Sequence, residues 1–259
     1  MVCDAKSAVS QHPCFNHAAR RWFSCVHLPV AISCNIKCRY CSREYACVNE
    51  NYKKAAGKTV SQREALKKMN NYIKNCERVR VVGVAGPGEP LANKETIEVL
   101  TKVNSHYPHL VKCVCTNGLM LEDNLHALLD AGVKTIAVTV NAVDPAIGGE
   151  IYRWVFYKNK PYHGTIGACL LLEKQLAGIR EAKKSGIMVK VNSILIPGIN
   201  DFHLREVAIA VKEAGAFVMN IVPIVPQAEF SLIQPPGSQL LRQAKEEIEP
   251  IIHLAESCR

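Results

Sequence analysis

Residues 26–41 read VHLPVAIS-CNIKCRYC, an apolar run that passes directly into three cysteines. The apolar part predicts a first β-strand over residues 26–33. Five further apolar runs rich in β-branched residues follow, at residues 79–86, 110–117, 133–141, 187–196 and 217–225. Near-continuous apolar runs of this length are typical of parallel strands that are buried on both faces. The sequence therefore predicts a parallel sheet of six strands.

Amphipathic helical segments lie between these strands, and we predict helices over residues 61–76, 93–107, 122–132, 172–186, 201–215 and 238–256. Ser61 is positioned to cap the first, and Gly132, Gly186 and Gly215 stand where three others should end. The alternation predicts an α/β fold with right-handed crossovers, either a partial (βα)6 barrel of the TIM type or an open sheet. Two regions do not follow this alternation of strands and helices: residues 1–25, and a long loop-like insertion at residues 141–169.

The composition narrows the class of protein. The chain has 259 residues, of which 48% are hydrophobic and 21% charged, as in soluble globular proteins. The sequence shows no membrane span and no apolar signal-peptide core, so we expect a cytoplasmic protein in a reducing environment. The net charge is +9, but the basic pairs are scattered and are not interleaved with aromatic residues. This pattern argues against nucleic-acid binding.

Twelve cysteines are the unusual feature of the composition. In a chain of this length without an export signal, they indicate metal or redox chemistry rather than disulfides. Cys34, Cys38 and Cys41 form a CxxxCxxC group after the first strand. Three thiolates can hold a four-iron cluster and leave one iron open to another ligand, with a zinc clip or chance clustering as the alternative.

Polar and glycine-rich groups follow the other strands. The second strand runs into Gly86-Pro87-Gly88-Glu89-Pro90, where glycines allow close backbone approach to a ligand and Glu89 can accept hydrogen bonds from an ammonium group. The next strands end in residues 116–118 (TNG), in Asn141 and in residues 192–193 (NS). Because the carboxyl ends of parallel strands share one edge of the sheet, we expect these groups to line one pocket.

The three-cysteine spacing, with Tyr40 before the third cysteine, together with the GPGEP loop, resembles the radical S-adenosylmethionine (SAM) superfamily. The resemblance implies a [4Fe-4S] cluster on Cys34, Cys38 and Cys41, whose open iron binds the amino and carboxylate groups of SAM. It also implies that the glycine-rich loop binds the methionine ammonium group. The residues expected to contact SAM are Tyr40, Gly86, Gly88, Glu89, Asn117, Thr139, Asn192 and Ile194.

Seven separated segments narrow the resemblance to the NifB-like family of nitrogenase cofactor biosynthesis, in the order found there: residues 12–22, 34–50, 83–93, 115–121, 141–152, 192–201 and 220–230. This family implies one partial-TIM-barrel domain with a ligand-bearing extension at residues 1–25, a core at 26–235 and a helix and tail at 236–259, the extensions lying over the barrel mouth. Its enzymes fuse two iron–sulfur units, K1 and K2, into an eight-iron precursor. The central carbide comes from a SAM methyl group, by methyl transfer and hydrogen abstraction after reductive SAM cleavage.

The resemblance also implies ligands for the two substrate clusters. The matching positions are His12, Cys14, Cys47, Cys113 and Cys258, with Glu50 and His27 as weaker candidates. For Cys47, Cys113 and Cys258 the alternative is an inert thiol, for His27 a hydrogen-bonded side chain, and for Glu50 a helix cap. We expect plain burial for the remaining cysteines, Cys3, Cys25, Cys76, Cys115 and Cys169. One departure from the family stands out, because Ala255 occupies the place of the first cysteine of a C-terminal CxxCR.

The family implies partners: iron–sulfur cluster donors, cofactor carrier or scaffold proteins of nitrogenase maturation, and an electron donor such as a ferredoxin or flavodoxin. No nucleic acid and no membrane is expected. Two other functions remain open from the sequence. One is a different radical SAM enzyme, of the molybdopterin-precursor or peptide-modifying type. The other is a non-catalytic iron–sulfur scaffold.

Overall fold

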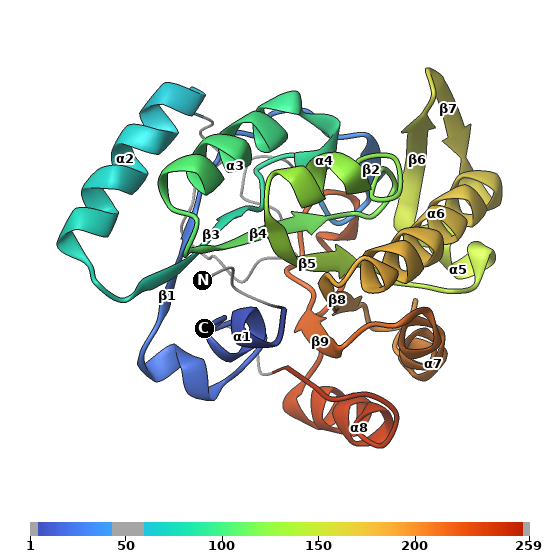
Figure 1. The fold of residues 1–259 in the computed structure, drawn as a ribbon. Coiled ribbons are helices and arrows are strands. Elements are labelled where there is room, and N and C mark those ends of the chain that lie inside the picture. The colour runs from blue at the N-terminus through green and yellow to red at the C-terminus, as the bar shows by residue number, and fades with distance from the viewer. Residues whose placement is uncertain (1–4, 43–59, 256–259) are drawn as a thin grey trace.

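The computed structural model describes residues 5–42 and 60–255, and it confirms the six-stranded parallel sheet. The strands follow the order β1-β3-β4-β5-β8-β9, and every neighbouring pair is parallel. The sheet curves into a partial barrel (Figure 1). Its strands are β1 (Ser24–His27), β3 (Val79–Val84), β4 (Val111–Thr116), β5 (Val133–Thr139), β8 (Met188–Leu195) and β9 (Val218–Pro223).

The predicted helices are present, with adjusted bounds. They are α2 (Gln62–Asn75), α3 (Lys94–His106), α4 (Leu125–Asp130), α6 (Gly164–Lys184), α7 (Leu204–Ala214) and α8 (Ser238–Ile248). Ser61 caps α2 by accepting the Glu64 N–H at 3.2 Å, and the three predicted stop glycines all have positive φ. The expected helix over residues 238–256 is too long, because Pro250 cannot continue α8.

The first strand differs from the prediction over residues 26–33. β1 ends at His27, and only Ala31 beyond it makes a further bridge, to Pro87. Pro29 has no N–H to donate to a ladder, which explains why this apolar run does not continue as a strand.

The insertion at residues 141–169 is not a loop, so that prediction is wrong. It forms α5 (Pro145–Ile151), β6 (Tyr152–Tyr157) and β7 (Lys160–His163), and it contains the start of α6. β6 pairs antiparallel with β7 and with β2 (Ile36–Cys38), which lies within the three-cysteine stretch. Gly148 lets α5 approach α6 closely, since a Cβ there would lie 2.8 Å from the Ala168 Cβ.

The two faces of the large sheet differ in character. Val82, Val84, Val114, Ile136 and Val138 belong to the main hydrophobic core, which the outer helices complete. On the opposite, concave face, the register aligns His27, Gly83, Cys113 and Thr135 across four strands. Figure 1 shows α1 (Ala5–Ser10) on the side of the sheet away from α3 and α4, and α1 contacts β5 and β8. The concave face therefore carries polar and sulfur-containing groups covered by the N-terminal segment.

Three short 3-10 helices complete the described elements: η1 (Ala18–Arg21), η2 (Pro90–Ala92) and η3 (Ala228–Phe230). After α8 the chain returns to the sheet and runs beside β9. The Met219 N–H donates to the His253 carbonyl at 2.9 Å, and the Ala255 N–H donates to the Met219 carbonyl at 2.7 Å. No helix within residues 5–42 and 60–255 is long and apolar enough to cross a membrane.

Gln175 of α6 provides a test of how the helix layer is fixed to the strand ends. Its buried amide donates to the Asn117 and Thr139 carbonyls at 2.8 and 2.7 Å. Gln175→Met removes both donors from buried acceptors, so we expect a loss of about 2–4 kcal/mol in unfolding free energy, measured by urea titration. The control Gln243→Met, at an exposed glutamine of α8, should stay within about 0.5 kcal/mol. Equal effects of the two changes would contradict the assigned role of Gln175.

Candidate active site

The three cysteines of the predicted radical site share one loop, residues 34–41, which we call the cysteine loop. Cys34, Cys38 and Cys41 are all partly exposed, and the structure places none of the nine cysteines in its described ranges in a disulfide. The Cys41 N–H donates to the Cys38 carbonyl at 3.2 Å, and Lys37 Nζ donates to the Cys41 carbonyl at 2.7 Å. The loop therefore turns at residues 38–41 and places the Lys37 ammonium group on the backbone of its last cysteine.

Asn93, just after the GPGEP loop, clamps the segment that enters the cysteine loop. Its Oδ1 accepts the Ile32 and Ser33 N–H groups at 3.1 and 3.0 Å. Its Nδ2 donates to the Ser33 and Glu89 carbonyls at 2.9 and 2.7 Å. Sequence reasoning missed this residue. The signal available was an asparagine at the start of a predicted helix, which indicates only a cap.

Gly88 fits the GPGEP loop against the same segment, as expected for a glycine at a close backbone approach. A Cβ at this position would lie 2.3 Å from the Ser33 carbonyl oxygen. The Gly88 N–H donates to the Ala31 carbonyl at 2.7 Å, and the Glu89 N–H donates to the Ser33 carbonyl at 2.8 Å. The GPGEP loop and the entry to the cysteine loop are therefore one hydrogen-bonded unit.

Glu89 is a buried carboxylate that joins this unit to the end of β4. Oε1 accepts from Thr116 Oγ1 and from the Leu91 N–H, and Oε2 accepts the Asn117 N–H at 2.7 Å. Burial raises the pKa of Glu89 to about 7, although these hydrogen bonds oppose the shift. Oε2 retains capacity for one more donor, which matches the expected role of Glu89 toward a ligand ammonium group.

Asn35 and Asn117 connect the cysteine loop directly to the TNG turn. Asn117 Nδ2 donates to Asn35 Oδ1 at 2.7 Å, and the Asn35 carbonyl accepts the Phe156 N–H at 2.8 Å. Asn35 Nδ2 is buried and has no hydrogen-bond partner among residues 5–42 and 60–255. An unused buried donor within a loop of three thiols fits an anionic iron–sulfur cluster, whose sulfur atoms accept hydrogen bonds.

Tyr40, the aromatic residue of the motif, belongs to the loop, and its side chain is buried. Asn141 Nδ2 donates to the hydroxyl groups of Tyr40 and Tyr152 at 2.9 and 3.1 Å. Asn141 Oδ1 accepts the Ile194 N–H at 2.8 Å. The Tyr40 ring thus anchors the cysteine loop to the ends of β5 and β8. Burial and the nearby Cys38 thiol raise the pKa of the Tyr152 hydroxyl well above its usual range.

Thr139 is the last residue of β5, and it lies in one row with Asn192, which is three residues before the end of β8. Asn192 pairs in register with Thr139 on one side and with Asn220 on the other. Asn220 Nδ2 donates to Asn192 Oδ1 at 3.2 Å. The structure therefore brings the residues predicted to contact SAM to the carboxyl edge of the sheet, at positions 40, 86, 88, 89, 117, 139, 192 and 194.

A second group of soft ligands lies on the concave face. His12, Cys14 and Cys25 each offer one ligand atom, and these three atoms lie within 4.8 Å of one another. The Cys14 N–H donates to His12 Nδ1 at 3.1 Å, whereas His12 Nε2 is buried without a hydrogen-bond partner in the described part of the chain. His12 and Cys14 are predicted ligands, but Cys25 is not.

Cys113 of β4 borders this group. The Cys113 thiol is buried and packs with Ala8 of α1, Val81 of β3 and Cys25 of β1. Its pKa is well below the usual range, because hydrogen bonding with Cys115, together with the electrostatic influence and hydrogen bonding of His12, outweighs burial. A thiol held toward its thiolate form is a better metal ligand than an inert core cysteine.

The other candidates divide between described and undescribed residues. Cys47, Glu50 and Cys258, like Cys3, lie outside the described residues. His27 lies against Gly83, whose missing side chain leaves room for the imidazole ring. The expectation of plain burial is wrong for four cysteines, because each is partly exposed: Cys25, Cys76, Cys115 and Cys169. Cys25 and Cys115 belong to β1 and β4, Cys76 caps the end of α2, and Cys169 contacts Glu173 along α6.

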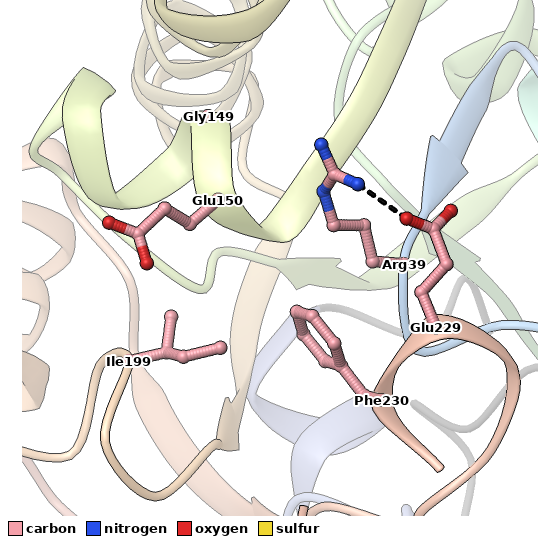
Figure 2. Close-up of a pocket in the computed structure, with 6 residues that line it drawn as sticks. All are labelled: Arg39, Gly149, Glu150, Ile199, Glu229 and Phe230. Atoms are coloured by element: carbon pink, nitrogen blue, oxygen red, sulfur yellow. Dashed lines mark hydrogen bonds and ion pairs between the residues drawn. The ribbon is translucent and has the colours of Figure 1, made fainter. Parts of the chain in front are cut away.

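A cavity of about 390 Å3 adjoins the cysteine loop at Arg39 (Figure 2). Its wall comprises Arg39, Gly149, Glu150, Ile199, Glu229 and Phe230. Glu229 pairs with Arg39 and, at 3.2 Å, with Arg153. Although desolvation opposes it, these two guanidinium groups lower the pKa of Glu229. Sequence reasoning missed this ion-paired wall, because Glu229 is 190 residues from Arg39 along the chain.

Comparison with known proteins agrees with this arrangement. Residues 28–210 match the model of the Radical SAM superfamily. The FeMo cofactor biosynthesis protein NifB of Methanocaldococcus jannaschii is 38% identical over 95% of this chain and 82% of that protein. NifB of Chlorobaculum tepidum is 42% identical over 96% of this chain, which spans only 60% of that protein. Streptococcus suis SuiB superposes with a TM-score of 0.66 over 94% of this chain and 54% of that chain, at 14% identity, and shows the fold alone.

A partial barrel of parallel strands with a three-cysteine loop after β1 is the arrangement of a radical SAM protein, the class that the superfamily match defines. Within that superfamily, the chain belongs to the NifB family. The expectation drawn from the seven sequence segments is confirmed at this level.

Asn93→Ala tests the clamp on the cysteine loop. The substitution leaves the Ile32 and Ser33 N–H groups without their acceptor and removes one of two donors from the Ser33 and Glu89 carbonyls, so we expect a loss of about 2–4 kcal/mol in unfolding free energy. Less iron should remain on the cysteine loop after reconstitution and desalting, because the loop is no longer held. The exposed Asn75→Ala change, at the end of α2, should affect neither measurement, and an equal response of the two variants would contradict the clamp.

Glu89→Gln tests the buried carboxylate through the pH dependence of stability. The folded-state pKa, about 7, lies above the ordinary value of 4.5, so ionisation disfavours the folded state. The stabilising contribution of protonated Glu89 to the folded state is fully present below pH 4.5, the ordinary pKa, and is lost as pH rises through about 7. Relative to Glu89→Gln, wild-type unfolding free energy should therefore fall by up to about 3 kcal/mol between these values, as measured by urea unfolding across pH. Parallel pH profiles would contradict the assignment.

Proposed function

We propose that this protein is a radical SAM enzyme of nitrogenase cofactor biosynthesis. It fuses two iron–sulfur substrate clusters and inserts a carbide derived from a SAM methyl group, making the eight-iron cofactor precursor. One observation carries the proposal: two separate sets of soft ligands occupy one half-barrel. The first is the cysteine loop at the carboxyl edge, and the second is His12, Cys14 and Cys25, with Cys113 beside them, on the concave face.

The residues at the carboxyl edge fit the resident cofactors. Cys34, Cys38 and Cys41 would hold the [4Fe-4S] cluster, and Asn35 Nδ2 supplies a buried donor in the same loop. When bound there, the cluster supplies the electron for the cleavage of SAM into methionine and a 5′-deoxyadenosyl radical. Glu89 would accept the methionine ammonium group through the remaining capacity of Oε2.

The apolar side chains around this site would limit the access of water to a reactive intermediate. Tyr40, Leu119, Ile194 and Val222 belong to an apolar cluster against which all three cysteines of the loop pack. A radical that abstracts hydrogen needs apolar surroundings of this kind, because water and mobile polar groups promote side reactions. The Asn93 and Asn117 contacts hold the loop in position against this cluster.

The concave face offers what anionic iron–sulfur substrates require. Imidazole and thiolate ligands are soft or borderline donors that suit iron and sulfide clusters. Lys190 of β8 adds a positive charge there, since its Nζ donates to the Cys14 carbonyl at 3.4 Å and lies 5.8 Å from the Phe15 ring centroid. We propose that His12, Cys14 and Cys113, with Cys47, Glu50 and Cys258, supply the ligands for the substrate clusters K1 and K2.

The proposal extends to partners and setting. Thiols and open clusters require a reducing, oxygen-poor environment, which we take to be the cytoplasm. Cluster donors, a carrier or scaffold for the product, and a ferredoxin or flavodoxin as electron donor would complete the system. Another radical SAM enzyme does not need the His12 group, and a non-catalytic scaffold does not need the Glu89 site.

Two cysteine substitutions separate the two sets of ligands. After anaerobic reconstitution and reduction with SAM, Cys38→Ala should abolish 5′-deoxyadenosine formation, because the radical cluster loses a ligand. Cys113→Ala should retain that activity but prevent incorporation of methyl-derived carbon into a cluster, measured with carbon-labelled SAM. Cys169→Ala, at a surface helix, should behave as wild type in both assays.

The outcomes distinguish the proposed enzyme from the other functions. If wild-type protein forms no 5′-deoxyadenosine, radical catalysis is wrong and the scaffold remains. If it forms 5′-deoxyadenosine but no labelled carbon enters a cluster, a different radical SAM enzyme is indicated. If Cys38→Ala and Cys113→Ala behave alike, the division between the two sets of ligands is wrong.

A further inference from the structure

Cys25 occupies a position that sequence patterns do not single out. It lies on β1, in register with Val81 of β3, and faces the segment that follows α1. His12 and Cys14 come from that segment, so three ligand atoms from two separate parts of the chain meet within 4.8 Å. Two cysteines and a histidine brought together by the fold form the donor set of a transition-metal centre rather than an isolated thiol.

His12 provides the second observation. Its side chain is 2% exposed, and Nε2 has no hydrogen-bond partner in the described part of the chain. A buried polar atom left in this state costs about 1–3 kcal/mol unless a ligand satisfies it. A metal bound at Nε2 would move the ring proton to Nδ1, which would then release the Cys14 N–H, so residues 12–14 should shift on loading.

Ala255 leaves this chain with one cysteine fewer than the NifB-like pattern implies. In the NifB-like pattern this position is a cysteine, and here it offers no metal-binding atom. A series of contacts links Ala255 to the His12 group. Its N–H donates to Met219 beside Val218, Val218 pairs with Lys190, and Lys190 donates to the Cys14 carbonyl. These contacts connect the strand that Ala255 follows to the segment that carries Cys14.

We propose that Cys25 is a third protein ligand, with His12 and Cys14, of a metal centre on the concave face, and that it compensates for the ligand missing at Ala255. The inference deepens the proposed function, on which it rests for the identity of the centre as an iron–sulfur substrate cluster. Binding releases one proton from each of the two thiols and leaves the oxidation state of the sulfur atoms unchanged.

The donor atoms also fit a single metal ion, so the experiment must distinguish the two kinds of centre. Ligands of one tetrahedral ion lie roughly 3.5–4 Å apart, whereas a four-iron cluster spreads its ligands more widely. The observed limit of 4.8 Å is close to the first arrangement. Loading with iron alone and loading with iron plus sulfide are therefore separate arms.

The test measures the accessibility of each cysteine by alkylation and peptide mass mapping of the 259-residue chain. Cys25 is partly exposed, so it should react without metal. Loading should slow its alkylation about tenfold, together with that of Cys14, because a metal-bound thiolate is a poor nucleophile. Cys169 in the same sample is the internal control and should react equally in both states. Protection in the sulfide arm only indicates a cluster, and protection by iron alone indicates a single ion.

Two variants make the result decisive. His12→Ala should restore Cys25 alkylation in loaded protein, and Cys25→Ser should lower the iron retained after desalting, whereas Cys169→Ser should not. If Cys25 reacts equally with and without metal while Cys14 is protected, the proposal is wrong. It is also wrong if Cys25 stays protected in loaded His12→Ala. These readouts require no turnover, so a protein that protects Cys25 but forms no 5′-deoxyadenosine would refute the proposed function and not this inference.

Discussion

Successive residues of a strand must face opposite sides of a sheet, and this constraint separates the core of the protein from its chemistry. In β4, Val114 belongs to the apolar layer under the helices, whereas its neighbours Cys113 and Cys115 face the opposite side of the sheet. In β3, Val82 and Val84 belong to the same layer, and Gly83 leaves room for His27. The helices stabilise the sheet through one face, and the other face is available for imidazole and thiol groups.

The carboxyl edge depends on buried polar groups as well as on apolar packing. Asn93, Glu89 and Asn117 connect the cysteine loop, the glycine-rich loop and the end of β4 through hydrogen bonds that are buried or partly buried. Such a network is stable only when its members are satisfied together, so it specifies one arrangement of the loops. Asn35 Nδ2, a donor with no partner among the described residues, lies within the cysteine loop. The network thus fixes the loop and leaves hydrogen-bonding capacity where a cofactor is proposed to bind.

The sequence predicted what depends on local period and spacing. Apolar runs such as residues 133–141 indicated the sheet, because buried strands favour apolar and β-branched residues. Gly215 marked the end of α7, because the residue that ends a helix with positive φ is usually glycine. The pairing of β2 with β6 could not be predicted, since Lys37 and Trp154 are brought together only by the fold. Cys25 was missed for the same reason. Its spacing resembles no ligand motif, and its meaning comes from the register of β1 and from a segment beyond α1.

The pairing of β2 with β6 ties the cysteine loop to a second, smaller sheet. Ile36 and Cys38 share a ladder with β6, and Phe156 of β6 also holds the Asn35 carbonyl. The backbone of residues 36–38 should therefore exchange its amide protons with solvent only when this sheet opens as a unit. The thiols are partly exposed and can be reached without such an opening, but the backbone that carries them cannot move freely. The spacing of the cysteines would thus be governed by the local unfolding equilibrium of residues 152–163, far from them in sequence.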